Sequence, residues 1–352
     1  MMFDLPPEDA LYDAMQANDP RYDGIAFVGV TSTGVFCRLV CPARTPKREN
    51  CRFFDTPTAC VEAGFRPCKR CHPIGRIAPE MTDLLDALEQ DPEYAWSEND
   101  ITQRSYDPSH IRRIFKAQFG VTFLSMARQR RLQLGFSTLS AGSKVIDAQL
   151  DAGFSSPSAF REAFQRLTGL NPGQLKTDAR LKASWIDTPL GPMITVADAS
   201  YLYLLEFLER KALPREMQRL FKDSKGDLGL GRTAITDQTE TALNAFFNGQ
   251  NPRLDLPLAP AGTEFERLVW HHLRQIPAGQ TRSYGALAAE MNRPNATRAV
   301  ARANGANPIA VVIPCHRVIA ADGALTGYGG GLWRKDKLIA LEKQYATRKD
   351  TV

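Results

Sequence analysis

Apolar residues recur at helical spacing through residues 81–180, and two stretches of this region share one layout. Residues 107–123 and 155–172 each carry a proline near the start, an apolar stripe and a glycine at the end. Because proline favours the first turn of a helix and glycine its end, each stretch predicts one helix. The basic segment 128–139 between them predicts a linking helix. The region is therefore predicted to form two helix-turn-helix units. The apolar stripes are Ile111, Ile114 and Phe115, then Phe160, Phe164 and Leu167.

The second half of the chain shows a different pattern. Residues 185–209 are rich in strand-forming residues and are broken by a Pro-Leu-Gly-Pro turn, which predicts a small antiparallel sheet. Residues 210–260 predict a connector of helices and loops that ends in a proline-rich stretch. From residue 262 to 342, helix and loop signals alternate, and the apolar run IPCHRVI at 313–319 would otherwise pass for a buried strand.

That run is interrupted by Cys315 and His316. A histidine beside a thiol can generate or stabilise thiolate, the reactive form of sulfur, which makes Cys315 a candidate nucleophile. The alternative is a small buried hydrophobic residue, which is the usual environment of a lone cysteine. His271 and His272 lie on a predicted helix, and we assign them no chemistry.

Length and composition limit the class of protein. The chain has 352 residues, of which 43% are hydrophobic, so it can bury several cores in two to four domains. Its first ten residues lack both the basic start and the apolar stretch of a signal peptide, and no run approaches the roughly 20 apolar residues of a membrane span. We therefore expect a cytoplasmic protein with no membrane partner, in which the seven cysteines serve as metal ligands or in chemistry rather than in disulfides.

The net charge of +5 is unevenly distributed. Residues 101–180 hold 12 lysines and arginines against five acidic residues, and residues 31–73 hold eight against three. Basic segments between acidic flanks favour a polyanionic partner, although a run of charge can also be only a solvated face.

Six of the seven cysteines lie between residues 37 and 71. Cys37 and Cys41 form one short-loop pair, and Cys68 and Cys71 form a second. The two pairs are separated by 26 residues, a spacing that predicts a tetrahedral four-thiolate zinc site. Such a site could be purely structural. Cys51 and Cys60 have no partner at loop spacing and are predicted to be core residues. The surrounding cations are Arg38, Arg44, Lys47, Arg48, Arg52, Arg66, Lys69 and Arg70.

The segments GVFCRLVCPAR and AGFRPCKRCHP resemble the amino-terminal module of the Ada DNA-repair and adaptive-response proteins. The resemblance implies that Cys37, the first zinc-bound cysteine, accepts a methyl group from a methylphosphotriester in DNA, with Arg44, Lys47 and Arg48 near the phosphates. Methylation would turn a thiolate into a thioether and remove one negative charge beside the phosphates. The affinity for DNA should then rise, by about 1–4 kcal/mol.

The segment DAGFSSPSAFREAF resembles the AraC-type activator domain, whose second helices enter successive major grooves of DNA. The chain departs from that pattern in the polar segment SENDITQRSY, where the family has an apolar helix, and at Gln149, where a small residue is common. The candidate base-reading or phosphate-binding residues are Ser109, His110, Arg112 and Arg113 in the first unit and Ser156, Ser158 and Arg161 in the second.

From Gly262 to Glu342 the sequence resembles the O6-alkylguanine-DNA alkyltransferases, through TRSYGALA, ATRAVARANG, IPCHRV and GYGGGL in that order. In that family a helix-turn-helix binds the minor groove, and the damaged base is swung out into a pocket beside the cysteine. The resemblance implies that Cys315 is the alkyl acceptor, that His316 acts on it through a water, and that Glu342 orients the histidine.

It also implies roles for three other residues. Arg298 would fill the gap in the base stack, Tyr284 would help to rotate the nucleotide and donate a hydrogen bond to the departing guanine, and Asn307 would stabilise a hinge. Taken without the resemblance, Tyr284 and Asn307 could be ordinary core and turn residues, and Arg298 could contact only phosphate. Tyr328 could brace the pocket or merely pack.

Together these patterns predict a multidomain α+β protein. We expect a zinc-binding α/β module at 1–77, an all-α AraC-type double helix-turn-helix at 78–180, a ribonuclease-H-like subdomain at 181–260 and a winged-helix alkyltransferase domain at 261–346. The predicted function is single-turnover alkyl transfer from DNA to Cys315 and Cys37, with the latter switching on transcription. The predicted cofactor is one zinc ion, and the predicted partners are double-stranded DNA, promoter DNA included, and RNA polymerase.

Two functions of other classes remain open at this point. A zinc transcription factor or damage-binding protein would hold alkylated bases without reacting, and the presence of Cys315 argues against it. A cysteine hydrolase would turn over an ester or peptide. A thioether has no easy route back to a thiol, so alkyl transfer predicts that one protein molecule repairs one lesion.

Overall fold

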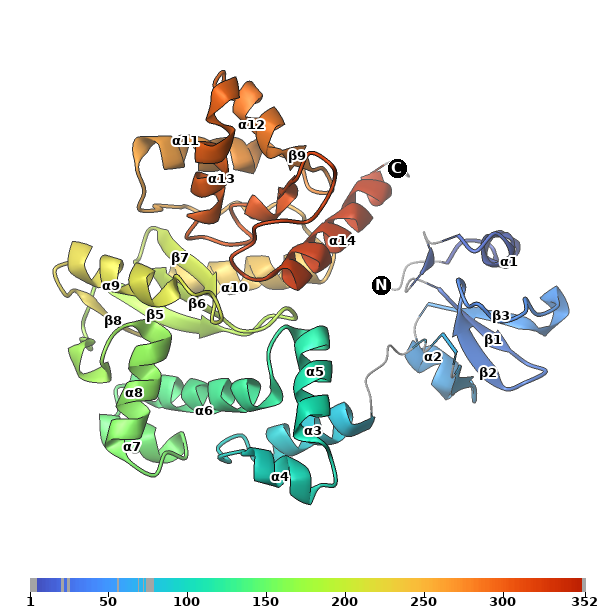
Figure 1. Cartoon of the computed structure of the whole chain (residues 1–352), viewed down its shortest axis with the longest axis horizontal. Helices are drawn as coiled ribbons and strands as arrows, with labels where there is room; N and C mark the ends of the chain where they lie inside the picture. Colours follow the sequence, from blue (N-terminus) through green and yellow to red (C-terminus); the bar gives the residue numbers. More distant parts are fainter. Residues whose placement is uncertain are drawn as a thin grey trace. The chain divides into compact units, whose positions relative to one another are not determined.

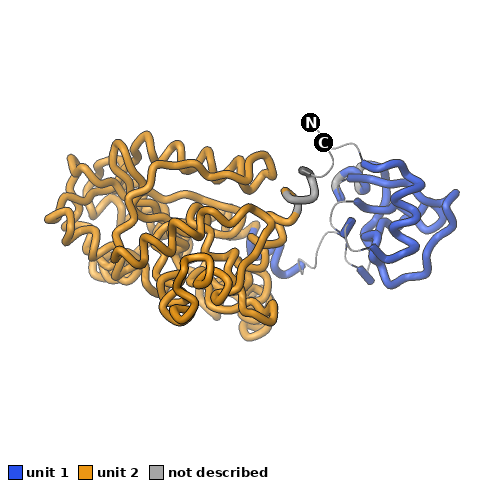
Figure 2. Tube along the Cα trace, turned by 90° about the horizontal axis from the view of Figure 1, so that it is seen from above, with its two compact units in different colours: residues 1–85 blue, residues 86–352 orange. Residues whose placement is uncertain are grey.

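The computed structural model describes residues 5–19, 22–23, 26–55, 57–68, 70–71, 73 and 79–349. The chain divides into two compact units, residues 1–85 and 86–352 (Figure 2). The domain boundary predicted between residues 77 and 78 lies outside the described residues, as does Lys69. Within the described helices, no segment has the length and apolar character needed to cross a membrane.

The first unit contains a four-stranded sheet in the order β3-β1-β2-β4 (Figure 1). Strand β1 is antiparallel to both β2 and β3, whereas β4 runs parallel to β2. In that parallel pair Phe36 is opposite Pro67, so Cys37 on β2 and Cys68, directly after β4, are the next residues along the two neighbouring segments. The elements are α1 (Glu8–Gln16), β1 (Phe27–Val30), β2 (Val35–Arg38), β3 (Cys51–Phe54), α2 (Pro57–Glu62) and β4 (Arg66–Pro67).

Both faces of this sheet are covered, because every residue of β1 is buried. One face packs against Leu11 and Met15 of α1, and the other carries a cluster of phenylalanines that includes Phe27 and Phe36. Cys51 and Cys60 are buried, one in each cluster, which confirms their prediction as core residues.

Residues 79–168 are helical, as the periodicity predicts. Helices α4 and α5 form the first helix-turn-helix pair and α7 and α8 the second, with the long α6 between them (Figure 1). The bounds are α3 (Pro79–Gln90), α4 (Glu98–Gln103), α5 (Pro108–Phe119), α6 (Phe123–Ser140), α7 (Val145–Asp151) and α8 (Pro157–Thr168).

The predicted start and stop signals act as expected in both second helices. Pro108 and Pro157 occupy the first helical position, and Asp107 and Ser156 accept hydrogen bonds from backbone N–H groups as N-caps. Gly120 and Gly169 end the helices in the left-handed region, at φ of 74° and 76°, where glycine has no steric penalty. Proline, the capping residue and glycine therefore determine where each of these two helices begins and ends.

The two departures from the AraC-type pattern are accommodated locally. In the polar segment before α5, Ser97 and Asp100 form a capping box that starts α4, and Ile101 provides its buried contact. Gln149 is buried on α7, and its side-chain Nε2 donates a hydrogen bond of 2.7 Å to the carbonyl oxygen of Phe154. The amide thus binds the turn between α7 and α8.

The second unit also contains a four-stranded sheet in the order β7-β6-β5-β8. The antiparallel part, β5 (Leu181–Ile186), β6 (Met193–Ala197) and β7 (Leu202–Phe207), confirms the predicted sheet. Strand β8 (Leu228–Leu230) lies parallel to β5, within a segment predicted to hold only helices and loops. Three residues are too few to show an alternating pattern. The flanking helices are α9 (Leu213–Asp223) and α10 (Ala234–Phe247).

Side chains of the helical region and of this sheet share one core. Phe136 of α6 packs against Phe164 of α8 and against Trp185 of β5, with ring centroids 6.1 Å and 6.0 Å apart. The same cluster includes Leu213 on α9. The division predicted at residue 180 thus crosses contiguous apolar packing, and the four-domain division stays a prediction.

The carboxy-terminal part is mainly helical, with a short parallel pair of strands (Figure 1). Its core contains Trp270 of α11, Val300 of α13 and Leu338 of α14. The apolar run 313–319 forms a 3-10 turn at Cys315–Arg317 and becomes a strand only at Val318. The elements are α11 (Glu264–Gln275), β9 (Arg282–Ser283), α12 (Tyr284–Glu290), α13 (Thr297–Gly305), β10 (Val318–Ile319) and α14 (Leu332–Lys349). The multidomain α+β class is confirmed.

Gly169 provides a test of the junction between α8 and α9. A Cβ atom at this position would lie 2.2 Å from the carbonyl oxygen of Pro214. Gly169→Ala should therefore lower the free energy of unfolding by about 2 kcal/mol or more, measured by urea denaturation with circular dichroism. The control is Gly173→Ala, where no atom lies within 4 Å and the free energy should stay within about 1 kcal/mol. Equal losses at both positions would contradict this assignment.

Candidate functional site: two cysteine centres

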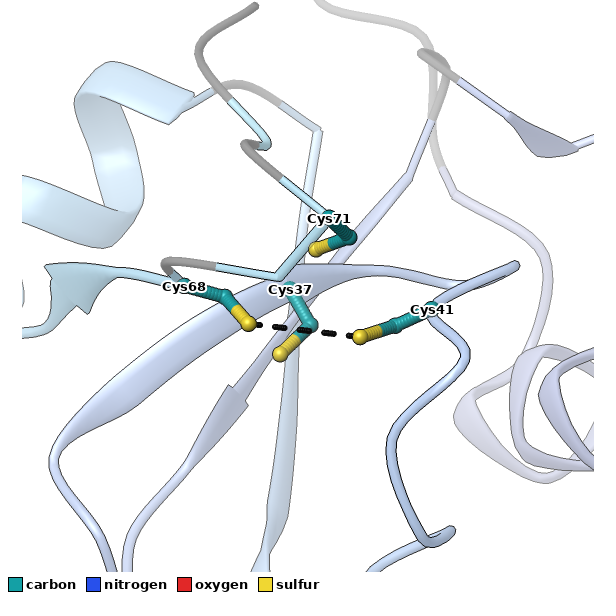
Figure 3. Close-up of side chains that lie close together, drawn as sticks. All are labelled: Cys37, Cys41, Cys68 and Cys71. Atoms are coloured by element: carbon teal, nitrogen blue, oxygen red, sulfur yellow. Dashed lines mark hydrogen bonds between the residues drawn. The ribbon is translucent and has the colours of Figure 1, made fainter.

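The four cysteines with metal-ligand spacing converge in the first unit (Figure 3). Their Sγ atoms all lie within 4.8 Å of one another, and those of Cys41 and Cys68 are 4.0 Å apart. Cys37 comes from β2, Cys68 directly follows β4, and Cys41 and Cys71 lie in the loops that follow. The parallel pairing of β2 and β4 therefore brings the two ends of the motif together.

This arrangement fits a zinc ion. With Zn–S bonds of about 2.3 Å, a tetrahedral site places neighbouring sulfurs about 3.8 Å apart, close to the spacing of these sulfurs. Two backbone N–H groups, from Arg38 and Arg70, donate hydrogen bonds of 3.4 Å to the sulfurs of Cys71 and Cys68. Such donors stabilise negative sulfur. A hydrogen bond from Cys37 also lowers the pKa of Cys71 to about 5.

Basic side chains line a groove beside these sulfurs, and Arg44, Lys47 and Arg66 are among them. Arg44 and Lys47 are exposed. Arg48, in contrast, forms ion pairs of 2.9 Å with Glu8 and 3.0 Å with Asp9. Two of the three cations predicted to meet DNA here are thus presented to solvent, and the third is held by acidic residues of α1.

The predicted DNA-contact residues of the helical region lie on α5 and α8. Arg112 and Arg161 are exposed, although Arg112 also pairs with Glu98. Arg113 lies 3.1 Å from the Nδ1 atom of His110. Ser156 caps α8, and its hydroxyl lies 3.1 Å from that of Ser158, so these serines have a structural role as well as the predicted one.

The second centre is built on the loop between α13 and the 3-10 turn. The side-chain amide of Asn307 donates a hydrogen bond of 3.1 Å to the sulfur of Cys315. The same amide nitrogen lies 2.8 Å from the carbonyl oxygen of Ile313, and the Asn307 oxygen accepts a 3.0 Å hydrogen bond from the N–H of Ile309. Val311 has a φ of 69°, a conformation rare for a β-branched residue. Backbone strain and one amide thus fix the position of the thiol.

His316 lies beside Cys315 and is fully buried. Its Nε2 atom is 2.9 Å from a carboxylate oxygen of Glu342 on α14, while its Nδ1 atom has no hydrogen-bond partner among the described residues. Arg317 donates two further hydrogen bonds of 2.8 Å to Glu342. The carboxylate therefore holds both the imidazole and the guanidinium, and Nδ1 is left available to another group.

Burial and neighbouring charge set the ionisation of this centre. Burial raises the pKa of Cys315 to about 11, against the opposing effect of the Asn307 hydrogen bond and of Arg210 and Lys335. Burial also lowers the pKa of His316, so its imidazole is neutral at neutral pH. Although burial opposes it, contact with His316 and then Arg317 lowers the pKa of Glu342 to about 2.

Three further predicted residues lie in the carboxy-terminal part of the chain. Tyr284 begins α12, is half-buried against the core, and has a pKa raised by burial. Arg298 is exposed in the first turn of α13. The ring of Tyr328 meets that of His316 edge-on at 6.4 Å, and its buried hydroxyl has no partner in the described part of the chain.

Comparisons with known proteins agree with the order of the two cysteine centres along the chain. Three family models match: the metal binding domain of Ada over residues 10–73, a helix-turn-helix domain over 103–178, and the DNA binding domain of 6-O-methylguanine DNA methyltransferase over 264–344. The chain is 33% identical to the bifunctional transcriptional activator/DNA repair enzyme Ada of Escherichia coli K12, over 97% of this chain and 98% of that protein. The chain belongs to the Ada family.

Two more relatives of this Ada-family chain cover its carboxy-terminal part. The methylated-DNA–protein-cysteine methyltransferase of Mycobacterium bovis is 45% identical, over 46% of this chain and 92% of that protein. A crystal structure of the Mycobacterium tuberculosis O6-methylguanine methyltransferase has 40% identity and a TM-score of 0.41, over 47% of this chain and 94% of that one. With the metal-binding family model, the sulfur cluster confirms the predicted four-cysteine metal site.

The structure also reveals charged residues that the sequence analysis missed. Arg317 contacts Glu342 and the carbonyl oxygen of Ile276, and Lys335 donates hydrogen bonds of 2.5 Å and 2.6 Å to the carbonyl oxygens of Val318 and Thr326. Their signal was present in the sequence: Arg317 is a charge inside an apolar run. On α14, residues 335, 338, 342 and 345 have the spacing of one buried helical face, which places a lysine and a glutamate in the core.

The pKa of Glu342 predicts how the stability of this Ada-family protein depends on pH. Its folded-state pKa of about 2 lies below the ordinary 4.5, so its contribution to stability is complete above pH 5 and is lost as the pH falls toward 2. The free-energy cost of Glu342→Gln should therefore be about 1 kcal/mol smaller at pH 3.5 than at pH 7, in urea denaturation. For the control Glu290→Gln, which removes an exposed ion pair with Arg282, the difference should stay within about 0.5 kcal/mol. A pH-independent cost at Glu342 would refute the assignment.

Proposed function

We propose that this Ada-family protein repairs alkylated DNA by two single-turnover transfers: from O6-alkylguanine to Cys315, and from methylphosphotriesters to Cys37. Its methylated-DNA–protein-cysteine methyltransferase activity and its regulatory activity follow from family membership. The observation that carries the first assignment is the 3.1 Å hydrogen bond from Asn307 to the sulfur of Cys315, beside the His316–Glu342 pair. We also place the protein in the cytoplasm, where a DNA partner and seven free cysteines are compatible.

The reaction at Cys315 begins with removal of its proton. Neutral His316 accepts this proton through a water at Nδ1, and the carboxylate of Glu342 stabilises the resulting imidazolium. The Asn307 amide stabilises the thiolate. The sulfur then attacks the alkyl carbon, the bond from that carbon to the guanine oxygen breaks, and guanine leaves with the electron pair. A hydrogen bond from the Tyr284 hydroxyl stabilises the charge on the departing guanine.

The exposed face of α13 binds DNA so that the damaged nucleotide can reach Cys315. Arg298 in its first turn occupies the space left in the base stack when the damaged nucleotide swings out. Extrusion costs a few kcal/mol, and it costs least for a base whose pairing the alkyl group has already weakened. Recognition of damage thus rests partly on the instability of the damaged base pair, and Arg298 and Tyr284 act on either side of that step.

The zinc module carries out the second transfer. Cys37, Cys41, Cys68 and Cys71 would hold the zinc ion, which would keep Cys37 as a thiolate at neutral pH. Arg44 and Lys47 hold the DNA backbone near Cys37. The methyl carbon moves from the phosphotriester oxygen to sulfur, and the phosphodiester leaves with the electron pair of the broken bond. The sulfur loses its negative charge in this step.

The methylated protein then activates transcription. Exposed residues of α5 and α8, with Arg112, Arg113 and Arg161 among them, contact promoter DNA. The neutral thioether at Cys37 reduces repulsion from nearby phosphates, so methylation raises affinity for that DNA. RNA polymerase is the partner that such an activator would contact.

The assignment of the two acceptors is tested with isotope-labelled methyl groups on duplex DNA. A duplex with O6-methylguanine should transfer one label to Cys315, and a duplex with a methylphosphotriester should transfer one label to Cys37, both located by peptide mass spectrometry. Cys315→Ala should abolish only the first transfer. Cys51→Ala, the control, alters a buried cysteine that is not one of the four metal-site cysteines, and it should leave both transfers intact. Unmodified sulfur at either predicted acceptor, or repeated turnover, would refute that assignment.

The proposed switch is tested in a Cys315→Ala background, where only Cys37 accepts methyl. After reaction with methylphosphotriester DNA and repurification, the protein should bind an undamaged duplex about tenfold more tightly than protein exposed to unmodified DNA. The difference should shrink as salt rises, because it is electrostatic. Equal dissociation constants at low salt would remove the switch.

A further inference from the structure

A buried arginine connects the sheet of the second unit to the loop that carries Asn307. Arg210 follows β7 and is only 6% exposed. One of its terminal nitrogens, Nη1, donates to a carboxylate oxygen of Glu206 and to the carbonyl oxygen of Asn307, the latter at 2.5 Å. The other, Nη2, lies 3.0 Å from the carbonyl oxygen of Gly305 and 3.1 Å from the carboxylate of Glu216. The guanidinium therefore joins two carboxylates to two backbone carbonyls.

The two carbonyls belong to the segment that positions the thiol. Gly305 is the last residue of α13, and the Asn307 side chain reaches the sulfur of Cys315. Strand β7 supports the same segment, since the N–H of Leu205 lies 2.9 Å from the carbonyl oxygen of Pro308, and the Leu205 carbonyl accepts a 2.7 Å bond from Ala310. Arg210 thus fixes the backbone on one side of Asn307, and β7 fixes it on the other.

Arg210 also lies against the glycine-rich loop. A Cβ atom at Gly329 would lie 3.1 Å from the Nε atom of Arg210, so the chain next to Tyr328 passes close over the guanidinium. Glu206 is buried beside it, and one of its oxygens has no partner within the described residues. Removing ions from water is costly, so a buried pair often stabilises a fold no more than apolar residues of similar volume would. The geometry of the pair points to positioning of the reactive loop as its function.

We propose that Arg210, held by Glu206, is a positioning residue for alkyl transfer that acts through Asn307. The guanidinium fixes the carbonyl oxygens of Gly305 and Asn307, and this directs the Asn307 amide at the sulfur of Cys315. The inference rests on the proposed role of Cys315 as alkyl acceptor. It differs from a role in stability alone, because it requires that the effect on the sulfur disappear when the Asn307 amide is absent.

The test is a double-mutant cycle in the full-length protein. Glu206→Gln with Arg210→Met removes the buried pair at similar volume, Asn307→Ala removes the amide, and a third protein combines all three changes. Single-turnover methyl transfer from excess O6-methylguanine duplex gives one rate. Alkylation of Cys315 by iodoacetamide, followed by peptide mass spectrometry, gives a second rate that needs no DNA.

We expect the pair substitution to slow both reactions about tenfold, with the dissociation constant for DNA unchanged. In a protein that already carries Asn307→Ala, the pair substitution should slow both reactions by less than about twofold further, because Arg210 and Asn307 act in one chain of contacts. The matched control is Glu209→Gln with Arg334→Met. Arg334 is also buried and binds Glu209 at 2.8 Å, but it contacts the carbonyl oxygens of Leu190 and Gly330 instead. Any decrease in rate caused by this control pair should combine multiplicatively with the decrease caused by Asn307→Ala, because the two then act independently.

Wild-type rates in the folded pair variant would overturn the proposal, and so would losses that simply multiply with those of Asn307→Ala. Arg210→Lys provides a second route if the pair variant does not fold. A single ammonium cannot reach both carbonyls and Glu206 in the geometry of the guanidinium, so we expect a several-fold loss, and a wild-type rate would again refute the proposal. If wild-type protein leaves Cys315 unmethylated, the proposed function fails, while the iodoacetamide cycle still decides the role of Arg210.

Discussion

Negative charge on buried sulfur is the constraint on which both centres depend. A thiolate removed from water is stable only where donors, cations or a metal face it, and burial is the main reason that the pKa of Cys315 is raised to about 11. The protein meets this constraint in two ways. Four cysteines gather around one metal position in the first unit, whereas in the second unit one amide, one imidazole and several buried charges surround a single thiol.

The charges around Cys315 form a connected set. Glu342 is shared between His316 and Arg317, and its low pKa keeps it ionised, so the histidine can receive a proton without leaving a buried charge unpaired. Arg210 holds the backbone nearby by donating hydrogen bonds to the carbonyl oxygens of Gly305, at the end of α13, and of Asn307. Such networks do not make a fold more stable than apolar packing would, but they place atoms accurately where a reaction requires it.

DNA recognition depends on different physics. The helices that would meet DNA, α5, α8 and α13, expose arginines, and the buried face of each helix anchors it in an apolar core. Side chains cap the starts of α5 and α8. Ion pairs hold some of these cations, such as Arg112 of α5 with Glu98, and surface pairs of this kind are weak enough for phosphate to replace. Recognition is therefore adjustable, while the reactive sulfurs are held rigidly.

Local chemistry in the sequence determined the helical pairs, because proline, capping residues and glycine act within one or two turns, and it determined the four metal ligands, because their spacing reflects two short loops. Family resemblance around Cys315 predicted the acceptor, the imidazole and the carboxylate, and the structure places that imidazole and that carboxylate 2.9 Å apart. Only the tertiary structure could show that Arg317, Lys335 and Arg210 serve the same centre, since their partners lie far away in the chain. The strand β8 and the shared core of α6, α8 and β5 likewise arise from contacts that a short pattern does not encode. Burial decides these features, and burial is a property of the folded chain.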